Sequence, residues 1–273
     1  MILACRSAEK TAPVVEEIRK ETGNDQVEFM ALDLGSLQSV KEFASAFRAK
    51  GLPLHILLNN AAVMACPYSL TEDGLEMQFG TNHIGHFYLT LLLFDLLDQA
   101  QPARIVNVSS GGHYFASWEN FQWDKVNDRA SYSPILGYGR SKLANILFGR
   151  ELNRRIAGRP VYANSIHPGA VMTDLGRHME DWMPKFMVPT AYYVVSWFLA
   201  TPQQGALNQL YVCTSPEIEE KDLRGLYFTP VGKVTSPSAL GQSDALAEEL
   251  WNFSVEIIKE KVPDFEIPEA LKI

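Results

Sequence analysis

Residues 137–152 read Gly-Tyr-Gly-Arg-Ser-Lys-Leu-Ala-Asn-Ile-Leu-Phe-Gly-Arg-Glu-Leu, with apolar residues at helical spacing. Side chains four positions apart share one face of a helix, so Tyr138 and Lys142 are expected to point into the same space. A free phenol has a pKa near ~10, and a fixed ammonium beside it favours the phenolate. The pair therefore predicts a general acid/base that exchanges a proton with an alcohol or carbonyl oxygen. A tyrosine and a lysine at this spacing also occur by chance, so the rest of the chain has to support the prediction.

Around this helix, apolar strand-like runs alternate with helical stretches along the whole chain. Strands are expected at residues 2–5, 27–32, 55–58, 103–108, 162–166 and, as the last, 225–230. Further helices are expected at residues 8–22, 36–50 and 75–99. This alternation predicts an α/β fold, a Rossmann-type doubly wound parallel sheet with helices on both faces. Because no repeat or linker interrupts it, residues 1–273 are interpreted as a single domain, with a loosely held tail from Val262.

Polar or turn-forming residues follow four of the expected strands. They are Asp33, Asn59-Asn60, Ser109-Ser110 and His167-Pro168-Gly169. Ligands of an open parallel sheet bind beyond the carboxyl ends of its strands, so these residues predict one functional edge. Each also has a simpler interpretation: the serines as helix or turn caps, the asparagines as turn residues, and Pro168-Gly169 as a turn.

Composition excludes several classes of function. The formal net charge is −8 and no block of Lys and Arg is present, which argues against nucleic acid as the main partner. The three cysteines and the histidines, including His83, His86 and His113, have neither disulfide-framework nor metal-ligand spacing, so no metal is expected. The apolar runs at residues 84–97 and 188–200 are interrupted or short, and suit buried or interfacial helices better than membrane spans.

With these residues assembled, the chain resembles the short-chain dehydrogenase/reductase family from Met1 to about Lys261. Within that family it is most similar to the branch of the NADP-dependent retinol dehydrogenases and the WW-domain-containing oxidoreductase. The stretches that carry the resemblance are Ile-Leu-Ala-Cys-Arg-Ser (2–7), Leu-Asp-Leu (32–34), Leu-Leu-Asn-Asn-Ala (57–61), Thr-Glu-Asp-Gly-Leu-Glu-Met-Gln-Phe (71–79), Asn-His-Ile-Gly-His-Phe (82–87), Arg-Ile-Val-Asn-Val-Ser-Ser (104–110), Tyr-Gly-Arg-Ser-Lys-Leu-Ala-Asn (138–145) and His-Pro-Gly-Ala-Val-Met-Thr (167–173).

The resemblance implies a catalytic set of four residues. Tyr138 is expected to be the acid/base, and Lys142 to hold the nicotinamide ribose and lower the pKa of the tyrosine. Ser110 is expected to hydrogen-bond the substrate oxygen. Asn82 is expected to position a water molecule and the helix that carries it, which completes a proton relay; it could also cap that helix.

The resemblance also implies a cofactor-binding set that includes Tyr138 and Lys142. Its other members are Asp33 and Leu34 beside the adenine, Asn60 and Ala61 against the adenosine ribose, and Pro168, Gly169, Val171 and Thr173 around the nicotinamide. Arg6 follows the first strand, where an acidic residue would bind the ribose 2′-hydroxyl of NAD. An arginine there suits a 2′-phosphate, so NADP is expected rather than NAD. The alternative for Arg6 is a solvated surface charge.

One departure from the family pattern bears on cofactor binding. The phosphate-binding loop, Thr-Gly-x-x-x-Gly-x-Gly, is absent from the sequence. We therefore expect the first βα unit of the fold to be missing, as in an N-terminally truncated chain. The missing strand would lie between the strands at residues 2–5 and 55–58, where its loss would leave unpaired backbone groups and a gap in the core.

Two segments rich in aromatic residues flank the expected active edge. Residues 111–137 carry Tyr114, Phe115, Trp118, Phe121, Trp123 and Tyr132, and residues 174–200 carry Trp182, Phe186, Tyr192, Tyr193, Trp197 and Phe198. Aromatic loops of this kind suit a large apolar ligand. Packing of the rings on each other, or on a partner subunit, is an equal alternative.

These observations favour an NADP(H)-dependent oxidoreductase that interconverts a lipophilic alcohol and its aldehyde or ketone, such as a retinoid, a steroid or a lipid carbonyl. The alternative is a catalytically impaired scaffold or binding protein, which the absent glycine loop favours and the catalytic set opposes. The expected location is cytoplasmic. Association with the surface of an intracellular membrane through residues 188–200, and a homodimer, both stay open.

Overall fold

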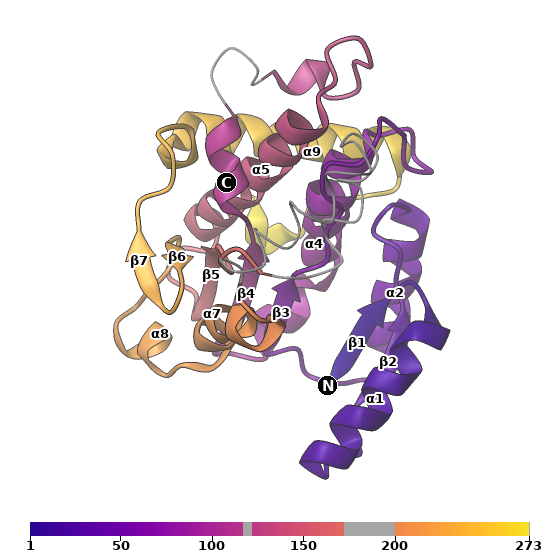
Figure 1. Cartoon of the computed structure of the whole chain (residues 1–273), viewed down its shortest axis with the longest axis vertical. Helices are drawn as coiled ribbons and strands as arrows, with labels where there is room; N and C mark the ends of the chain where they lie inside the picture. The colour runs from indigo at the N-terminus through magenta and orange to yellow at the C-terminus, as the bar shows by residue number, and fades with distance from the viewer. Residues whose placement is uncertain (117–121, 172–199, 273) are drawn as a thin grey trace, which may run out of the picture.

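Seven strands form two sheets in the computed structural model, which describes residues 1–116, 122–171 and 200–272 (Figure 1). In the smaller sheet, β1 (Ile2–Cys5) and β2 (Glu28–Ala31) pair in parallel. The larger sheet has the order β3-β4-β5-β6-β7. Its strands are β3 (Ile56–Asn59), β4 (Ala103–Val108), β5 (Val161–Ile166), β6 (Tyr227–Thr229) and β7 (Lys233–Thr235).

The far end of the larger sheet differs from the expected one. Strands β3 to β6 are parallel, as predicted, but β7 pairs antiparallel with β6. The strand expected at residues 225–230 was wrong as the last strand, because the chain turns back after Thr229. Gly232, at φ +67°, supplies the left-handed backbone conformation of this turn.

The helices begin at residues that cap them. Ser7, Ser36, Ser133 and Ser243 each accept a hydrogen bond from a backbone N–H of the first turn. The helices are α1 (Ala8–Thr22), α2 (Leu37–Ala49), α3 (Met77–Phe79), α4 (Gly85–Gln99), α5 (Pro134–Arg155), α7 (Pro202–Thr214), α8 (Glu217–Glu220) and α9 (Asp244–Lys261). The long helix expected at residues 75–99 is divided, because a π-helical turn, η1 (Gly80–Ile84), joins α3 to α4. Short 3₁₀ turns are η2 (Gly111–Phe115), η3 (Trp123–Lys125), η5 (Leu240–Gln242) and η6 (Glu269–Leu271).

Helices cover both faces of the larger sheet. Successive side chains of a strand point to opposite faces. On β4, Ile105 accordingly packs with the helices α4, α5 and α9, whereas Val106 packs with Val212 of α7 and Ile218 of α8. The predicted α/β architecture with helices on both faces is confirmed.

The first of these layers is held by aromatic contacts. The ring centroids of Phe87 on α4 and Phe148 on α5 lie 5.0 Å apart, and Trp251 on α9 lies 5.0 Å from Phe87. All three side chains are almost fully buried. Burial of such a ring contributes about 1.5–3 kcal/mol, so this cluster fixes α5 against its neighbours.

The β1–β2 unit is joined to the larger sheet through helices. Arg48 of α2 forms an ion pair with Asp95 of α4, and Leu34 packs so closely on Gly85 that a Cβ at residue 85 would clash with the Leu34 carbonyl. Among the described residues β1 pairs only with β2, and β3 only with β4. Ile56 and Leu58 on β3 are 41% and 40% exposed.

The C-terminal segment is packed against the domain, which corrects the expectation of a loosely held tail. Phe265 and Leu271 are buried, and the Phe265 ring lies 5.4 Å from that of Tyr88. The Leu271 carbonyl accepts a hydrogen bond of 3.0 Å from Arg155. The two prolines of the tail therefore direct the chain back onto the core.

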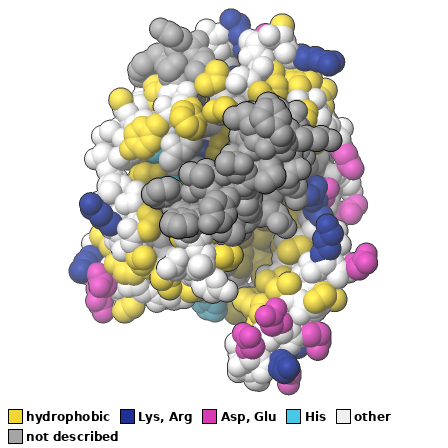
Figure 2. Space-filling view, viewed as in Figure 1, with side chains coloured by type: hydrophobic (Ala, Val, Ile, Leu, Met, Phe, Trp, Pro, Cys, Tyr) yellow, Lys and Arg dark blue, Asp and Glu magenta, His cyan; other side chains and the backbone are white. Residues whose placement is uncertain are grey.

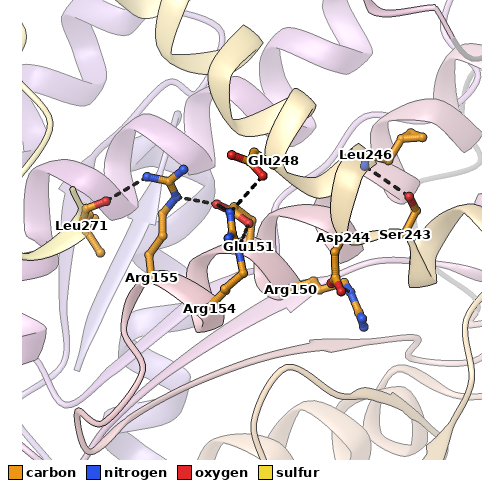
Figure 3. A network of polar contacts seen from close by, with 9 residues as sticks. All are labelled: Arg150, Glu151, Arg154, Arg155, Ser243, Asp244, Leu246, Glu248 and Leu271. Carbon is orange, nitrogen blue, oxygen red and sulfur yellow. Dashed lines mark hydrogen bonds and ion pairs between the residues drawn. The ribbon is translucent and has the colours of Figure 1, made fainter. Parts of the chain in front are cut away.

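Charged residues tie α5 to α9 near the C-terminal end of α5 (Figure 3). Glu151 is almost fully buried and pairs with Arg154 at 2.8 Å and Arg155 at 2.6 Å. The Arg155 guanidinium also lies 4.3 Å from the ring centroid of Trp251. Removing one partner of a buried ion pair leaves the other charge buried without a counter-charge. The stability of the fold is therefore sensitive to changes in this network.

Glu151→Ala is expected to lower the free energy of unfolding by about 3–5 kcal/mol, because it leaves Arg155 buried without its counter-charge. Asp264→Ala is the matched control, since it breaks the exposed Lys41–Asp264 pair, also 2.8 Å long. The control is expected to change the free energy by less than about 1 kcal/mol. Urea unfolding of both variants measures the difference, and equal effects would contradict the role given to Glu151.

Candidate active site

Three of the four predicted catalytic side chains meet at the carboxyl end of β4. Tyr138 and Lys142 lie one turn apart on α5, and the Lys142 amine is 5.7 Å from the centroid of the Tyr138 ring. Ser110 follows β4, and its side chain is close enough to Tyr138 to lower the pKa of the phenol. The phenol and the amine therefore share one side of the helix, as their spacing predicts, and the serine hydroxyl lies beside them.

The electrostatics of the pair differ from the expectation. Burial raises the pKa of Tyr138, and the neighbouring Ser110 side chain offsets this only in part. Burial also lowers the pKa of the Lys142 ammonium to about 7. A lysine that is close to neutral cannot lower the pKa of the phenol strongly, so the lowering predicted for Tyr138 is wrong for this structure.

The end of β4 and the residue that follows it hold α5 in place. The Lys142 amine donates to the Val108 carbonyl at 2.9 Å, and Asn145 donates to the same carbonyl at 3.1 Å. The Ser109 hydroxyl donates to the Lys142 carbonyl at 2.6 Å. Ser109 therefore fixes α5 rather than capping a helix, and Ser110 alone of the two serines faces Tyr138.

Asn82 joins this group from the π-turn η1. Its side-chain carbonyl accepts from the Val63 N–H at 2.8 Å, and its amide donates to the Val63 carbonyl at 2.8 Å and to the Ser141 hydroxyl at 2.9 Å. Ser141 in turn donates to the Tyr138 carbonyl at 2.8 Å. Asn82 is thus connected to the backbone of Tyr138 through Ser141.

The backbone carbonyl of Asn82 has a side-chain partner. Nδ1 of His86 lies 3.0 Å from this oxygen and donates to it, since a carbonyl can only accept. A π-turn displaces the ordinary helical pairing of its carbonyls, and such turns occur often at functional sites. Burial lowers the pKa of His86 to about 4. His86 is therefore neutral near pH 7 and supports the turn, in line with its structural interpretation.

His113 supports Ser110 in a comparable way. Its Nε2 accepts from the Ser238 N–H at 3.0 Å, so its Nδ1 carries the proton and donates to the Ser110 carbonyl at 2.7 Å. Burial lowers the pKa of His113, which keeps this neutral form. The Ser110 hydroxyl also accepts from the Gly112 N–H at 3.0 Å, so the serine caps η2 while it faces Tyr138.

The residues predicted to bind the adenosine half of a cofactor are placed unequally. Arg6 after β1, and Asn60 and Ala61 after β3, are exposed. The Asp33 carboxylate accepts from the Gly35 N–H at 2.8 Å and closes its own turn. The Leu34 side chain is buried against α4, and its place beside an adenine stays a prediction.

The residues predicted around the nicotinamide follow β5. Pro168 and Gly169 are half-buried, and Gly169 has φ +92°, which favours glycine at this turn. Val171 bridges to Ala200 and packs on Gly205 of α7. Thr173 lies outside the described residues.

The donor set fits a nicotinamide dinucleotide. The fully buried Lys142 amine directs one of its hydrogens to Val108, which leaves donor capacity for the hydroxyls of a ribose. The exposed Arg6 guanidinium, at the end of β1, suits a phosphate. Arg6 follows β1, and the Lys142 amine bonds the last residue of β4, so both lie at carboxyl ends of parallel strands, where ligands of such sheets bind.

The aromatic residues near this edge divide into two groups. Trp123 is buried in the core beside Phe79, with ring centroids 5.7 Å apart, and the Tyr132 hydroxyl donates to the Cys66 carbonyl at 2.7 Å. These two pack within the protein, on residues outside the two aromatic segments. Tyr114 and Phe115 on η2 are 59% and 56% exposed beside the site. The remaining aromatic residues of the two predicted segments, Trp118, Phe121, Trp182, Phe186, Tyr192, Tyr193, Trp197 and Phe198, lie outside the described residues.

On the face shown in Figure 2, Lys and Arg are scattered among Asp and Glu. Within residues 1–116, 122–171 and 200–272 no cluster of His, Cys, Asp and Glu could hold a metal ion. In that same part of the chain no helix is long and apolar enough to cross a bilayer, and residues 188–199 fall outside it.

Sequence reasoning missed two polar residues that connect this site, Ser141 and Gln78. Ser141 lies within the Tyr138–Lys142 stretch, and a small hydroxyl residue inside a helix that bears catalytic residues was a usable signal. Gln78 is fully buried and bonds three residues on two segments, Ala65 on one and Tyr132 and Pro134 on the other. Its only signal was its place four residues before Asn82, on the same helix face.

Known proteins resemble the chain over most of its length. Residues 1–121 match the model of the short chain dehydrogenase family. Human retinol dehydrogenase 11 is 42% identical over 260 residues, which cover 94% of this chain and 77% of that protein. Human WW domain-containing oxidoreductase is 40% identical over 272 residues, 96% of this chain and 63% of its own length.

Solved structures agree. An uncharacterized protein from Mycobacterium Paratuberculosis has a TM-score of 0.69 at 32% identity, covering 98% of this chain and 85% of its own. NADPH-bound carbonyl reductase from chicken fatty liver has a TM-score of 0.60 at 22% identity, covering 86% of this chain and 87% of its own, and shows the shared fold. The identity with the retinol dehydrogenase, over three quarters of that protein, decides the relationship: this chain belongs to the short-chain dehydrogenase/reductase family, whose members are oxidoreductases that act on CH–OH groups with NAD(P).

Proposed function

We propose that this protein is an NADP(H)-dependent oxidoreductase that interconverts a lipophilic alcohol and its aldehyde or ketone. The observation that carries the proposal is the meeting of Tyr138, Ser110 and Lys142 at one sheet edge, with Asn82 linked to them through Ser141. A buried phenol beside a serine hydroxyl and an amine is the arrangement expected for proton transfer to an oxygen.

The residues of this chain would orient the substrate and transfer the proton. A bound nicotinamide supplies or accepts the hydride. Ser110 donates a hydrogen bond to the substrate oxygen and orients it toward the Tyr138 phenol. In reduction the phenol gives its proton to the carbonyl oxygen as the C–H bond forms, and in oxidation it takes the proton back. Lys142, with a pKa of about 7, can return a proton to the tyrosine at neutral pH.

The lipophilic substrate is supported by the surroundings of Ser110. Tyr114 and Phe115 on the adjoining turn are large apolar side chains with 59% and 56% of their surface exposed. Such groups gain free energy when an apolar ligand covers them. The name of the related retinol dehydrogenase makes retinaldehyde the first compound to test.

Association with a membrane surface belongs to the same proposal, because a lipophilic substrate dissolves in the bilayer. Residues 188–200 carry the apolar run proposed for this contact. Liposome flotation tests it, and a protein that stays wholly in the soluble fraction would contradict it.

Tyr138→Phe is expected to abolish reduction of retinaldehyde by NADPH, because the ring keeps its packing but loses the transferable proton. The measurement is NADPH oxidation by the purified chain, followed by absorbance. Tyr162→Phe is the matched control, a buried tyrosine on β5 that packs on the other face of the sheet with α7 and α8. It is expected to leave the rate within about twofold, since a surface or core change away from the site moves binding and chemistry little.

Two outcomes would overturn this part of the proposal. Turnover by Tyr138→Phe at the wild-type rate would remove the tyrosine as acid/base. A wild-type chain that neither turns over nor binds NADPH saturably would instead favour a binding or scaffold role.

Arg6→Ala is expected to weaken NADPH binding by about tenfold or more and NADH binding by little. The physical reason is the loss of a charge-assisted hydrogen bond to the 2′-phosphate, worth about 1.5–3 kcal/mol. Fluorescence titration with both nucleotides measures the two affinities. Lys20→Ala is the control, an exposed cation at the opposite end of α1. Equal losses for NADPH and NADH would show that Arg6 does not read the phosphate.

Lys142→Met is expected to flatten the pH dependence of stability. The folded chain releases the Lys142 proton near pH 7, whereas the unfolded chain keeps it until about pH 10.4. Between these values the unfolded state binds more protons, so the wild-type free energy of unfolding should rise with pH relative to the variant, by up to ~1.4 kcal/mol per pH unit. Urea unfolding from about pH 7 to about pH 9 measures this, and parallel profiles would show that the amine stays charged in the fold.

A further inference from the structure

A fully buried glutamine, Gln78, lies one helical turn before Asn82. Its side-chain carbonyl accepts from the Ala65 N–H at 2.8 Å. Its amide nitrogen donates to the Tyr132 hydroxyl and to the Pro134 carbonyl, both at 2.9 Å. We call Gln78 with these three partners the Gln78 bridge.

The orientation of the Gln78 amide is determined by its partners. The Ala65 N–H can only donate and the Pro134 carbonyl can only accept, so the oxygen and nitrogen positions cannot be exchanged. Tyr132 accepts from Gln78 and donates its own hydroxyl hydrogen to the Cys66 carbonyl at 2.7 Å. The side chains of Tyr132 and Gln78 therefore bond each other and the backbone of the consecutive residues 65 and 66.

Gln78 and Asn82 make matching connections. Asn82 binds Val63 on one side and Ser141 of α5 on the other. Gln78 binds Ala65 on the same segment and Pro134 of the same helix. The two amides thus hold the segment 63–66 and α5 at two points each.

The Glu76 carboxylate caps the short helix α3, which carries Gln78. Glu76 accepts from the backbone N–H groups of Gln78 and Phe79, at 2.8 Å and 2.9 Å. It is therefore the N-cap of α3, which begins at Met77. Glu76 is itself almost fully buried. The position of Gln78 on its helix is therefore fixed by this cap.

The contact with Pro134 reaches the catalytic turn directly. In an α-helix the carbonyl of residue 134 is the acceptor for the N–H of residue 138. Gly137, which precedes Tyr138, makes room for the bridge, since a Cβ there would lie 2.9 Å from the Gln78 nitrogen. The amide of Gln78 thus contacts the turn from which the Tyr138 phenol projects.

We propose that Gln78 is a positioning residue, which holds the first turn of α5 so that the Tyr138 phenol lies at the reaction distance from Ser110. The inference rests on the proposed function of Tyr138. It assigns to Gln78 no contact with substrate or cofactor. Its effect should therefore appear in the rate of the chemical step and not in cofactor affinity.

Two variants test the bridge. Gln78→Leu removes all three hydrogen bonds, and Tyr132→Phe removes the tyrosine hydroxyl while it keeps the Gln78 contacts with Ala65 and Pro134. Each should lower kcat for retinaldehyde reduction, by about 100-fold for Gln78→Leu and about tenfold for Tyr132→Phe, because a small misplacement of a catalytic group costs up to about 10²-fold in rate. The Kd for NADPH, titrated by fluorescence, should stay within about twofold.

A second readout does not depend on turnover. Hydrogen exchange followed by mass spectrometry should show faster exchange in peptides covering residues 62–68 and 132–142 of both variants. Asn164→Leu is the matched control, because Asn164 is equally buried and its amide bonds Leu223 and Leu226, on the loop before β6. It should speed exchange in residues 221–227 and leave both kcat and the two bridge peptides at the wild-type level.

The outcomes separate the two proposals. If Tyr138→Phe abolishes turnover but both bridge variants keep the wild-type kcat, the positioning role is wrong and the proposed function stands. If the wild-type chain shows no turnover, the proposed function fails, and unchanged exchange in the bridge peptides then removes the bridge as well. A kcat loss that Asn164→Leu reproduces would reduce Gln78 to a general contributor to stability.

Discussion

The structure depends on a helix whose polar side chains are buried. Tyr138, Ser141, Lys142 and Asn145 of α5 are each at most 7% exposed. A buried polar group without a partner costs about 1–3 kcal/mol, so each of them needs a defined neighbour. The Val108 carbonyl accepts hydrogen bonds from Lys142 and Asn145. The Ser141 hydroxyl donates to the helix backbone. Rotation of α5 by one residue would break these bonds together, which makes the position of the helix unique.

The same burial sets the chemistry of the site. Removal of water raises the pKa of the Tyr138 phenol and lowers that of the Lys142 ammonium, so the two values move apart and the ammonium becomes the stronger acid of the pair. Transfer of a proton from the Lys142 ammonium to a Tyr138 phenolate is therefore favourable. Packing of α5 thus suits the lysine, which is ordinarily protonated at pH 7, to resupply the proton of the proposed acid/base.

Some sequence predictions were met because their signals are local. Strands β1 and β4 and helix α1 occupy the predicted residues, since apolar runs, capping serines and a terminal glycine act within a few positions. The tail was mispredicted because its prolines suggested a free chain, whereas distant residues, Tyr88 and Arg155, hold it. Likewise the antiparallel strand β7 was not predicted, because it forms by pairing with β6. Its three residues alone carry no pattern that indicates a strand.

The sequence by itself determined the α/β class, the alternation of strands and helices as far as β5, and the pairing of Tyr138 with Lys142, because helix and strand periodicity decide which side chains share a face. Only the tertiary structure decided what surrounds them: that Ser109 fixes the helix while Ser110 faces the phenol, that Leu34 is core, and that Gln78 connects three segments. The physical reason is that burial and hydrogen-bond partners come from residues far apart in the chain, and pKa values follow burial.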